Sequence, residues 1–573
     1  MRKAKKQVSD FIDGMLKTKV DVILPHNLSK TDFLKHKPAH YDDTEWIDGC
    51  RWVVHSIKEL DFIKKYKGSS EFSPLYSIIL KKILGNNYRD FINGLIDAQI
   101  IETDEEYSAT GHQCFGFKLS EKYDSSPIKY VTLTSKTLKN AILNYRKERI
   151  KKLKQKALPL AHLVRWLSEP SNLTIDKVAA LEFLESYKRK LQTELSKRKL
   201  KPKYKKIQQG FIDKRYYKIK FQIENWDISA QLSIDDSGGR VYSSLTGLPS
   251  IFRNFLQFKG EKLVSLDLKN SQPFNFLFLL KKEFWKSYTS GITLKRLNKE
   301  LYDYITNKQR NNITIPNIMF PKTPETQYSK GLQDANFLNL VTEGKLYEFI
   351  CHHFYGHFTT TSGIDRFSTR NLTKKQVLKL MYSNPKRYNP EVKAIFKKFK
   401  ETFPIEGGIM EILKQRKHND LSVLLQTIEA QMLLHRIGKR IFLHNPNIPL
   451  YSIHDSLVTT EQYAPVVKQI MEDEYNNHLG LTPTIKLEEY SEDNASKELS
   501  KYVKGKVTEA DIEISQSVSV LPKGFGFLKC EHYDYYKTKK EALPPVFDLV
   551  NYTIPEALKD VSVLGVNKRK LKK

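Results

Sequence analysis

Two short apolar runs in the last third of the chain flank a polar pair. Pro449–Ile453 and Leu457–Thr460 are strand-forming stretches, and His454-Asp455 stands between them. Short apolar runs on either side of a polar break predict a β-hairpin. The pair then lies at or beside the tight turn, where a carboxylate can protrude instead of being buried. The pattern therefore predicts a protruding aspartate, Asp455, at the tip of a hairpin.

A second predicted strand, Leu263–Leu268, also carries one isolated carboxylate. Val264, Leu266 and Leu268 alternate along the strand and so share one face. Asp267 projects from the other face, together with Leu263 and Ser265. The pattern thus predicts two strand-borne aspartates, Asp267 and Asp455, which are far apart in the sequence.

A helix is predicted between these strands, within 370–385. Its apolar stripe has i, i+3, i+4 spacing and consists of Val377, Leu380 and Met381. Thr373 and Gln376 have capping-box spacing, which makes Thr373 the expected N-cap, and Pro385 stops the helix.

Four residues of this segment recur every fourth position: Arg370, Lys374, Leu378 and Tyr382. If helical geometry extends back to Arg370, they drift only about 40° per step and stay on one side of the helix. Two cations followed by an aromatic ring can bind a triphosphate and then pack beside the sugar and base. The alternative is a solvated basic helix with one interfacial tyrosine.

The two aspartates suit metal-dependent phosphoryl transfer. Carboxylates on neighbouring strands can hold a pair of Mg²⁺ ions roughly 3.5–4 Å apart, which stabilise the attacking and leaving oxygens. Mn²⁺ can take the place of Mg²⁺ in such a site. The structural alternative for His454-Asp455 is an ordinary turn.

Together the three segments resemble the palm and fingers of single-subunit polymerases, which comprise the family A DNA polymerases and the phage-type and mitochondrial RNA polymerases. The resemblance covers roughly 233–490. It implies that Asp267 and Asp455 are catalytic metal ligands and that Arg370, Lys374 and Tyr382 bind the nucleotide. Lys374 would also protonate the leaving pyrophosphate. It further implies that His454, Arg240 and Arg253 contact the template–primer. Gln426 and Gln431 lie on a predicted amphipathic helix before the hairpin and could reach minor-groove acceptors, which are nearly the same for every base pair. The alternative is a pair of exposed glutamines on a surface helix.

The resemblance leaves the choice between DNA and RNA open. Ser456 and Leu378 match the RNA polymerases, and Ser383 replaces a glycine common to both groups. Gln272 stands five residues after Asp267, where the DNA enzymes place a bulky residue that excludes the ribose 2′-OH. If the alignment slips by two, Phe274 takes that place. On Gln272 we expect DNA synthesis to be favoured over RNA synthesis.

Composition favours a nucleic-acid partner. The chain has 95 Lys and Arg against 65 Asp and Glu, a net charge of +30. Seven cations lie in Arg146–Lys156 and ten in Lys188–Lys206. This excess predicts salt-dependent binding to a polyanion. A basic tail, Lys568–Lys573, is expected to be disordered.

The expected fold is α+β: a right-hand polymerase with an antiparallel-sheet palm, mostly helical fingers and thumb, and a small N-terminal module. The expected segments are an N-terminal module at 1–135, a basic helical thumb-like region at 136–232, and a first palm segment at 233–283. Fingers follow at 284–420, a second palm segment at 421–500, and a C-terminal extension at 501–573. The helix–helix–hairpin order within 78–119 is that of a winged helix, which docks on duplex DNA, or of a purely structural module.

Three functions remain open: a DNA polymerase, a single-subunit DNA-directed RNA polymerase, and a non-catalytic DNA-binding replication factor with a polymerase-like fold. The expected partners are a nucleic-acid template–primer and dNTPs or NTPs. No apolar run is long enough to span a bilayer, and we find no secretory signal, so we expect a cytoplasmic protein or one encoded by a virus or mobile element acting in the host cytoplasm. The sequence leaves the oligomeric state open.

Overall fold

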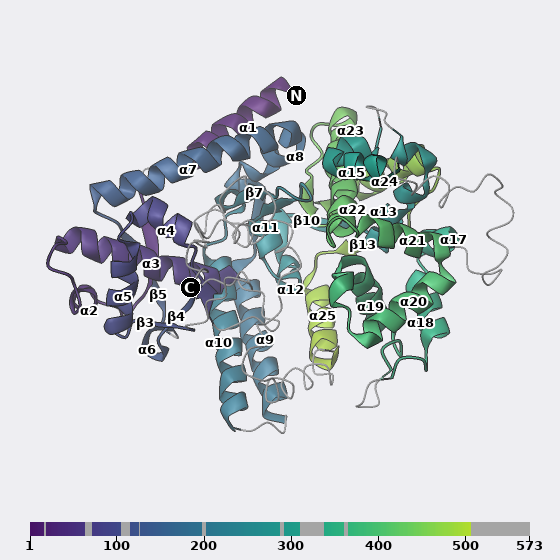
Figure 1. Cartoon of the computed structure of the whole chain (residues 1–573). Helices are drawn as coiled ribbons and strands as arrows, with labels where there is room; N and C mark the ends of the chain where they lie inside the picture. The colour runs from purple at the N-terminus through teal and green to yellow at the C-terminus, as the bar shows by residue number, and fades with distance from the viewer. Residues whose placement is uncertain are drawn as a thin grey trace. The chain divides into compact units, whose positions relative to one another are not determined.

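The computed structural model describes residues 1–16, 19–63, 72–104, 115–124, 126–197, 202–286, 291–309, 337–359 and 365–505. The chain folds into two compact units (Figure 1). Among the described residues, the first unit comprises those within 1–234, 242–263 and 489–505, and the second those within 235–241 and 264–488. Both contain helices and strands, and the strand pairing is antiparallel, so the protein is a mixed helix-and-sheet fold.

Some expected features lie outside the described residues. These are the basic tail Lys568–Lys573, the C-terminal extension beyond Gly505, residues 105–114 within the predicted hairpin, and residues 198–201 of the second cationic run.

The first unit begins with the elements of the N-terminal region. They are α1 (Arg2–Gly14), β1 (Asp21–Pro25), α2 (Lys30–Leu34), α3 (Asp43–Ile63), β2 (Ser73–Pro74), α4 (Ser77–Leu84), α5 (Tyr88–Asp97), β3 (Ile101–Thr103), β4 (Gly116–Leu119), α6 (Glu121–Asp124), β5 (Ile128–Thr132) and α7 (Lys136–Ala157). The remaining elements are α8 (Ala161–Val164), β6 (Leu173–Ile175), α9 (Lys177–Lys197), α10 (Pro202–Glu224), β7 (Leu232–Ile234), β8 (Val241–Ser243), α11 (Ser244–Gly247), α12 (Ser250–Arg253), β9 (Leu256–Phe258) and α25 (Glu492–Gly505).

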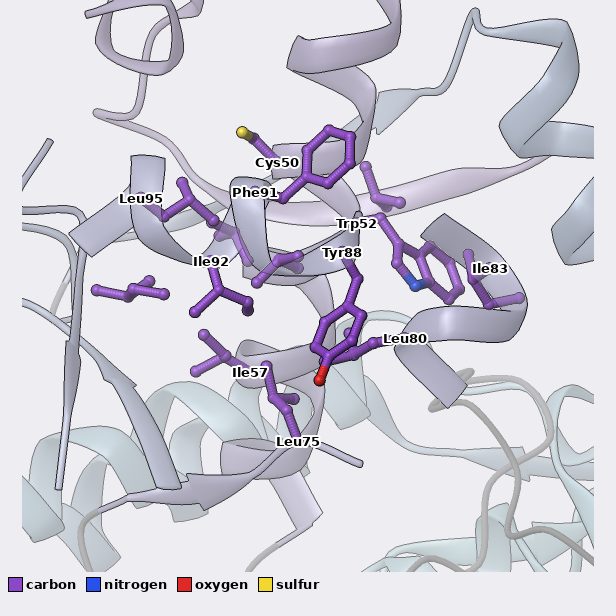
Figure 2. Packing of buried hydrophobic residues seen from close by; sticks show 14 of the residues in the cluster. Cys50, Trp52, Ile57, Leu75, Leu80, Ile83, Tyr88, Phe91, Ile92 and Leu95 are labelled. Atoms are coloured by element: carbon purple, nitrogen blue, oxygen red, sulfur yellow. The ribbon is translucent and has the colours of Figure 1, made fainter. Parts of the chain in front are cut away.

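Helices α3, α4 and α5 pack around an apolar core, some of which Figure 2 shows. Helix α5 comes close to α3 because Gly49 has no side chain: a Cβ there would lie 2.2 Å from the Phe91 ring. The Phe91 ring in turn stacks on Trp46, with ring centres 5.0 Å apart. Burial of these large rings removes apolar surface from water and stabilises the module.

The N-terminal module has the predicted helix–helix–hairpin order. Three residues join α4 to α5, and the first of them, Gly85, has a φ of +80°, which glycine adopts without strain. Strands β3 and β4 follow, and β2 completes a three-stranded sheet in the order β2-β4-β3. Arg89 and Asn93 are exposed on α5, but so is Asp97. Docking of this module on DNA stays a prediction.

Helices α9 and α10 form an antiparallel pair (Figure 1). The ammonium of Lys177 at the start of α9 donates to the carbonyl of Glu224 at the end of α10. Midway along the pair, Lys188 and Asp213 form an ion pair of 3.1 Å. This pair lies in the region expected to be thumb-like.

The second unit contains the candidate site. Its elements are β10 (Glu261–Leu268, from Val264 on), α13 (Ser271–Phe276), α14 (Leu294–Leu297), α15 (Lys299–Gln309), α17 (Phe337–Thr342), α18 (Leu346–Phe354), α19 (Arg370–Tyr382), α20 (Pro390–Thr402), α21 (Pro404–Leu413), α22 (Asp420–Ala430), α23 (Gly438–His444), β11 (Tyr451–Ile453), β12 (Ser456–Thr460), α24 (Ala464–Leu479) and β13 (Ile485–Glu489). A π-helical turn, Gln431–Ile437, joins α22 to α23 in one continuous helical run.

The sheet of this unit has the order β11-β12-β10, and β13 also pairs with β10. Val264, Leu266 and Leu268 of β10 are all buried, as their alternation predicts. The other side of the strand is covered as well, because Leu263 and Ser265 are also buried. None of the described helices combines the length and apolar character that a membrane crossing requires.

Candidate active site

Asp267 lies near the end of β10, beside the β11–β12 hairpin. Ile453 pairs with Ser456, so His454 and Asp455 form a two-residue turn, and His454 has a φ of +53°. Strand β12 is the neighbour of β10, and the Ser456 hydroxyl donates a 2.8 Å hydrogen bond to Oδ1 of Asp267. The structure therefore brings the turn residues next to Asp267, with Ser456 as the direct link.

The two aspartates interact electrostatically. Burial and, second, the negative charge of Asp455 raise the pKa of Asp267 to about 6 from its ordinary 3.8. The hydrogen bond from Ser456 and the positive charge of Lys374 act in the opposite direction. At neutral pH the ionised pair is therefore held together against mutual repulsion, which a bound cation would relieve.

This repulsion gives a pH-dependent prediction. Because the pKa of Asp267 is raised on folding, its ionisation destabilises the folded protein as pH rises from about 4 to about 6. Without metal, Asp267→Asn should therefore raise the free energy of unfolding at pH 7.5 by on the order of 1–2 kcal/mol. The gain should shrink toward zero at pH 4.5. Thermal melts of both proteins at the two pH values measure this, and an equal change at both would contradict it.

Helix α19 begins at Arg370, one turn earlier than its capping-box spacing predicts. Thr369 is the N-cap, and its hydroxyl accepts a hydrogen bond from the Leu372 N–H. Thr373 is fully buried and donates to the Thr369 carbonyl. The expected N-cap at Thr373 is therefore wrong, because that side chain faces the core. The earlier start places Arg370 inside the helix with Lys374 and Tyr382.

Each of these three residues has a different environment. Arg370 is exposed, pairs with Glu348, and its guanidinium lies 5.3 Å from the centre of the Tyr347 ring. Lys374 is exposed, and its charge lowers the pKa of Asp267. Burial and, second, the charge of Glu429 raise the pKa of Tyr382, so its phenol stays protonated. The helix thus places a cation near Asp267 and a neutral hydroxyl near Glu429.

A buried lysine fixes the end of this helix. The Lys414 ammonium donates to the carbonyls of Leu380 and Ser383, the latter at 2.9 Å. It also lies 3.3 Å from the Tyr388 hydroxyl. A cation at a helix C-terminus satisfies carbonyls that have no partner within the helix. Lys414 therefore holds the turn on which Tyr382 stands, a role that the sequence pattern did not indicate.

Gln272 and Phe274 lie on α13, directly after the Asp267 strand. The Gln272 side chain is 9% exposed, and its Nε2 donates a 2.6 Å hydrogen bond to Glu429. The Phe274 ring is fully buried and packs edge-on against Tyr475, with ring centres 5.3 Å apart. Both candidates for contact with the sugar are thus buried, and contact of either with a sugar stays a prediction.

Arg240 has a partner within the protein, and Gln426 is buried. The Arg240 guanidinium donates to Glu429 through Nε at 2.9 Å and through Nη2. Gln426 is buried beneath the loop that carries Arg240, since a Cβ on Gly238 would lie 2.9 Å from that of Gln426. Gln431 is half-buried at the start of the π-helical turn. Arg240 thus pairs with a buried carboxylate of the protein, and contact of Arg240, Gln426 or Gln431 with a nucleic acid stays a prediction.

Arg253 belongs to the first unit and is also engaged internally. Its guanidinium donates to the carbonyls of Leu248 at 3.0 Å and Thr246 at 3.4 Å. Burial lowers its pKa. Contact of Arg253 with a nucleic-acid backbone stays a prediction.

The sequence interpretation missed Glu429. It lies on α22, is fully buried, and accepts hydrogen bonds from Arg240, Ser271 and Gln272. Burial raises its pKa, and the Arg240 charge opposes that shift. A signal existed: a glutamate within the apolar stretch Leu421–Leu434 is buried only when it is paired.

Among the described residues there is no group of three or more His, Cys, Asp or Glu side chains that could hold a metal. Asp267 and Asp455 are two carboxylates, and a site built on them needs further ligands from water or substrate phosphates, as Mg²⁺ commonly takes.

No protein-family model and no curated protein sequence matches the chain. Among solved structures, it is similar to the POL domain of Pol1 from M. smegmatis in a complex with DNA primer-template and dNTP. That likeness has a TM-score of 0.36 and 10% sequence identity, and it covers 61% of this chain and 73% of the other.

Proposed function

We propose that this protein is a template-directed nucleotidyltransferase. In this reaction a primer 3′-hydroxyl attacks the α-phosphate of a nucleoside triphosphate, the new phosphodiester bond forms and pyrophosphate leaves. The observation that carries the proposal is the placement of Asp455 beside Asp267 through the Ser456 hydrogen bond. Two carboxylates gathered from distant segments, with a cationic helix beside them, form the minimal set for phosphoryl transfer.

The aspartate pair fits Mg²⁺. Both donors are hard carboxylate oxygens, and burial together with the nearby charge of Asp455 raises the pKa of Asp267, which supports a cation between them. Asp267 and Asp455 would hold the ions, which supply charge stabilisation for the attacking and leaving oxygens when bound. Ser456 holds the Asp267 carboxylate in one orientation.

The fingers-like helix α19 would bind the nucleotide. Lys374 is exposed and acts electrostatically on Asp267, so it can reach a phosphate held near that carboxylate. We assign it the additional role of protonating pyrophosphate as it leaves. Arg370 would exchange Glu348 for a phosphate, and the Tyr382 ring would pack beside the sugar.

We favour DNA as the product. Gln272 is bulky and held in place, and a fixed side chain at the sugar excludes a 2′-OH by a steric clash. A single-subunit RNA polymerase is the second candidate, because Ser456 makes its hydrogen bond to Asp267 where DNA enzymes of the similar family have glutamate. A non-catalytic replication factor is less favoured, since binding alone gives no reason to hold two acids together beside a polyanion. We place the activity in the cytoplasm of the cell, or of the host of a mobile element.

Primer extension tests the proposal directly. The purified protein, a primed DNA or RNA template and Mg²⁺ are incubated with dNTPs or with NTPs, and the products are separated by length. Template-dependent extension with dNTPs is the expected result. Binding of the template with no extension under any nucleotide or metal, Mn²⁺ included, would favour the non-catalytic factor.

A further inference from the structure

The carboxylate of Glu429 is fully buried, and both of its oxygens accept hydrogen bonds. Its Oε1 accepts two hydrogen bonds from the Arg240 guanidinium, one of them 2.9 Å long. Its Oε2 accepts hydrogen bonds from Ser271 at 2.8 Å and from Gln272 at 2.6 Å. A buried charge persists only when it is paired and hydrogen-bonded in this way.

This carboxylate fixes the direction of the Gln272 amide. A carboxylate only accepts hydrogen bonds, so Gln272 must present its NH₂ group to Glu429. Its carbonyl Oε1 is then directed elsewhere; that atom is buried and has no hydrogen-bond partner among the described residues. Because Oε1 is enclosed, Gln272 cannot turn it toward a ligand hydroxyl without leaving Glu429.

Glu429 is itself held by a distant loop. Arg240 follows Gly238 and Gly239, whose N–H groups both donate at 2.7 Å to the Asp235 carboxylate. The loop lies against α22, where the Thr427 hydroxyl donates to the Ser237 carbonyl at 3.2 Å. Arg240 thus reaches Glu429 from a loop that these hydrogen bonds hold in place.

We propose that Glu429 is a positioning residue that sets sugar discrimination by holding the Gln272 side chain in place. This inference rests on the proposed function. A steric clash discriminates only if the side chain cannot move aside, and a charge-assisted hydrogen bond within a buried network supplies that rigidity. Replacing a buried Arg–Glu pair by apolar residues is often neutral or stabilising, so such a pair is weak evidence of a stability role.

The test is a double-mutant cycle on sugar choice. Glu429→Gln keeps the shape but removes the charge, and Gln272→Met keeps the length but removes the NH₂ donor. For native protein, both single variants and the double variant, kcat/KM is measured for a dNTP and for the matching NTP. The ratio of the two kcat/KM values is insensitive to a general loss of activity, because such a loss lowers both values.

We expect the native ratio to favour the dNTP and each single variant to lower it about tenfold, the scale of one charge-assisted hydrogen bond. The double variant should match Gln272→Met alone, since Glu429 acts through Gln272. Glu429→Asp keeps the negative charge that Glu429→Gln removes. It should therefore discriminate against the NTP measurably better than Glu429→Gln does, and that result would support the same conclusion.

Three results would overturn the inference: additive effects, an unchanged ratio in Gln272→Met, or a native preference for NTPs. Failure of the proposed function looks different, because native protein would then extend no primer with any nucleotide. A thermal melt shows whether Glu429→Gln folds. If it does not, Gln272→Met alone tests the inference. This variant keeps the dNTP preference if the bulk of the side chain is sufficient, and it loses the preference if the hydrogen bond to Glu429 is needed.

Discussion

Replacing either Asp267 or Asp455 by asparagine is expected to lower nucleotide incorporation by at least about a thousandfold. Asparagine keeps the shape of the side chain but removes the negative charge that would bind a divalent ion. The loss should appear in single-turnover incorporation at saturating primer–template. Template binding, measured by fluorescence anisotropy, should change little, because the clustered cations that would attract a nucleic acid lie elsewhere in the chain.

Glu461→Gln is the matched control for these variants. Glu461 follows β12 directly and is exposed, so its substitution removes one negative charge just beyond the hairpin without touching the aspartate pair. It should retain near-normal incorporation. If Asp267→Asn or Asp455→Asn retained near-normal extension as well, the polymerase assignment would fail.

The metal-free melts separate this loss of activity from a loss of fold. Asp267→Asn should melt at a higher temperature than native protein at pH 7.5 and yet be inactive. An inactive variant that is more stable than the native protein indicates a functional site, since such sites hold like charges together at a cost in stability.

Lys374→Ala should give the next largest effect, a fall in kcat of about a hundredfold with a smaller change in the nucleotide KM. A cation that neutralises and protonates the leaving pyrophosphate acts chiefly in the transition state, so its loss slows chemistry more than binding. Pre-steady-state incorporation over a range of nucleotide concentrations separates the two parameters.

Lys375→Ala supplies the comparison. Lys375 is the next residue of α19, is exposed like Lys374, and points about 100° away around the helix. It should change neither parameter by more than a few fold. A Lys374→Ala variant that raised only the nucleotide KM would contradict the proton-donor role and leave Lys374 as a phosphate contact.

The local sequence pattern was sufficient to predict the elements that carry the candidate site. Strand alternation predicted β10, the polar break predicted the hairpin turn at His454-Asp455, and the four-residue recurrence placed Arg370, Lys374 and Tyr382 on one helix. These features depend on backbone geometry and on neighbours within a few residues, which is why one sequence suffices to find them. The N-cap at Thr369 was missed because burial of Thr373 depends on tertiary packing.

Only the tertiary structure decided which polar groups meet. The Ser456–Asp267 and Arg240–Glu429 pairs each join residues 189 positions apart, and neither has a local sequence signature. The same holds for the burial of Phe274 against Tyr475, which joins residues of α13 and α24. Hydrogen bonds and ion pairs are short-ranged, so whether two such groups interact is fixed by how distant segments pack. The sequence determined which side chains the candidate site has, and packing determined their partners, their orientation and the pKa of Asp267.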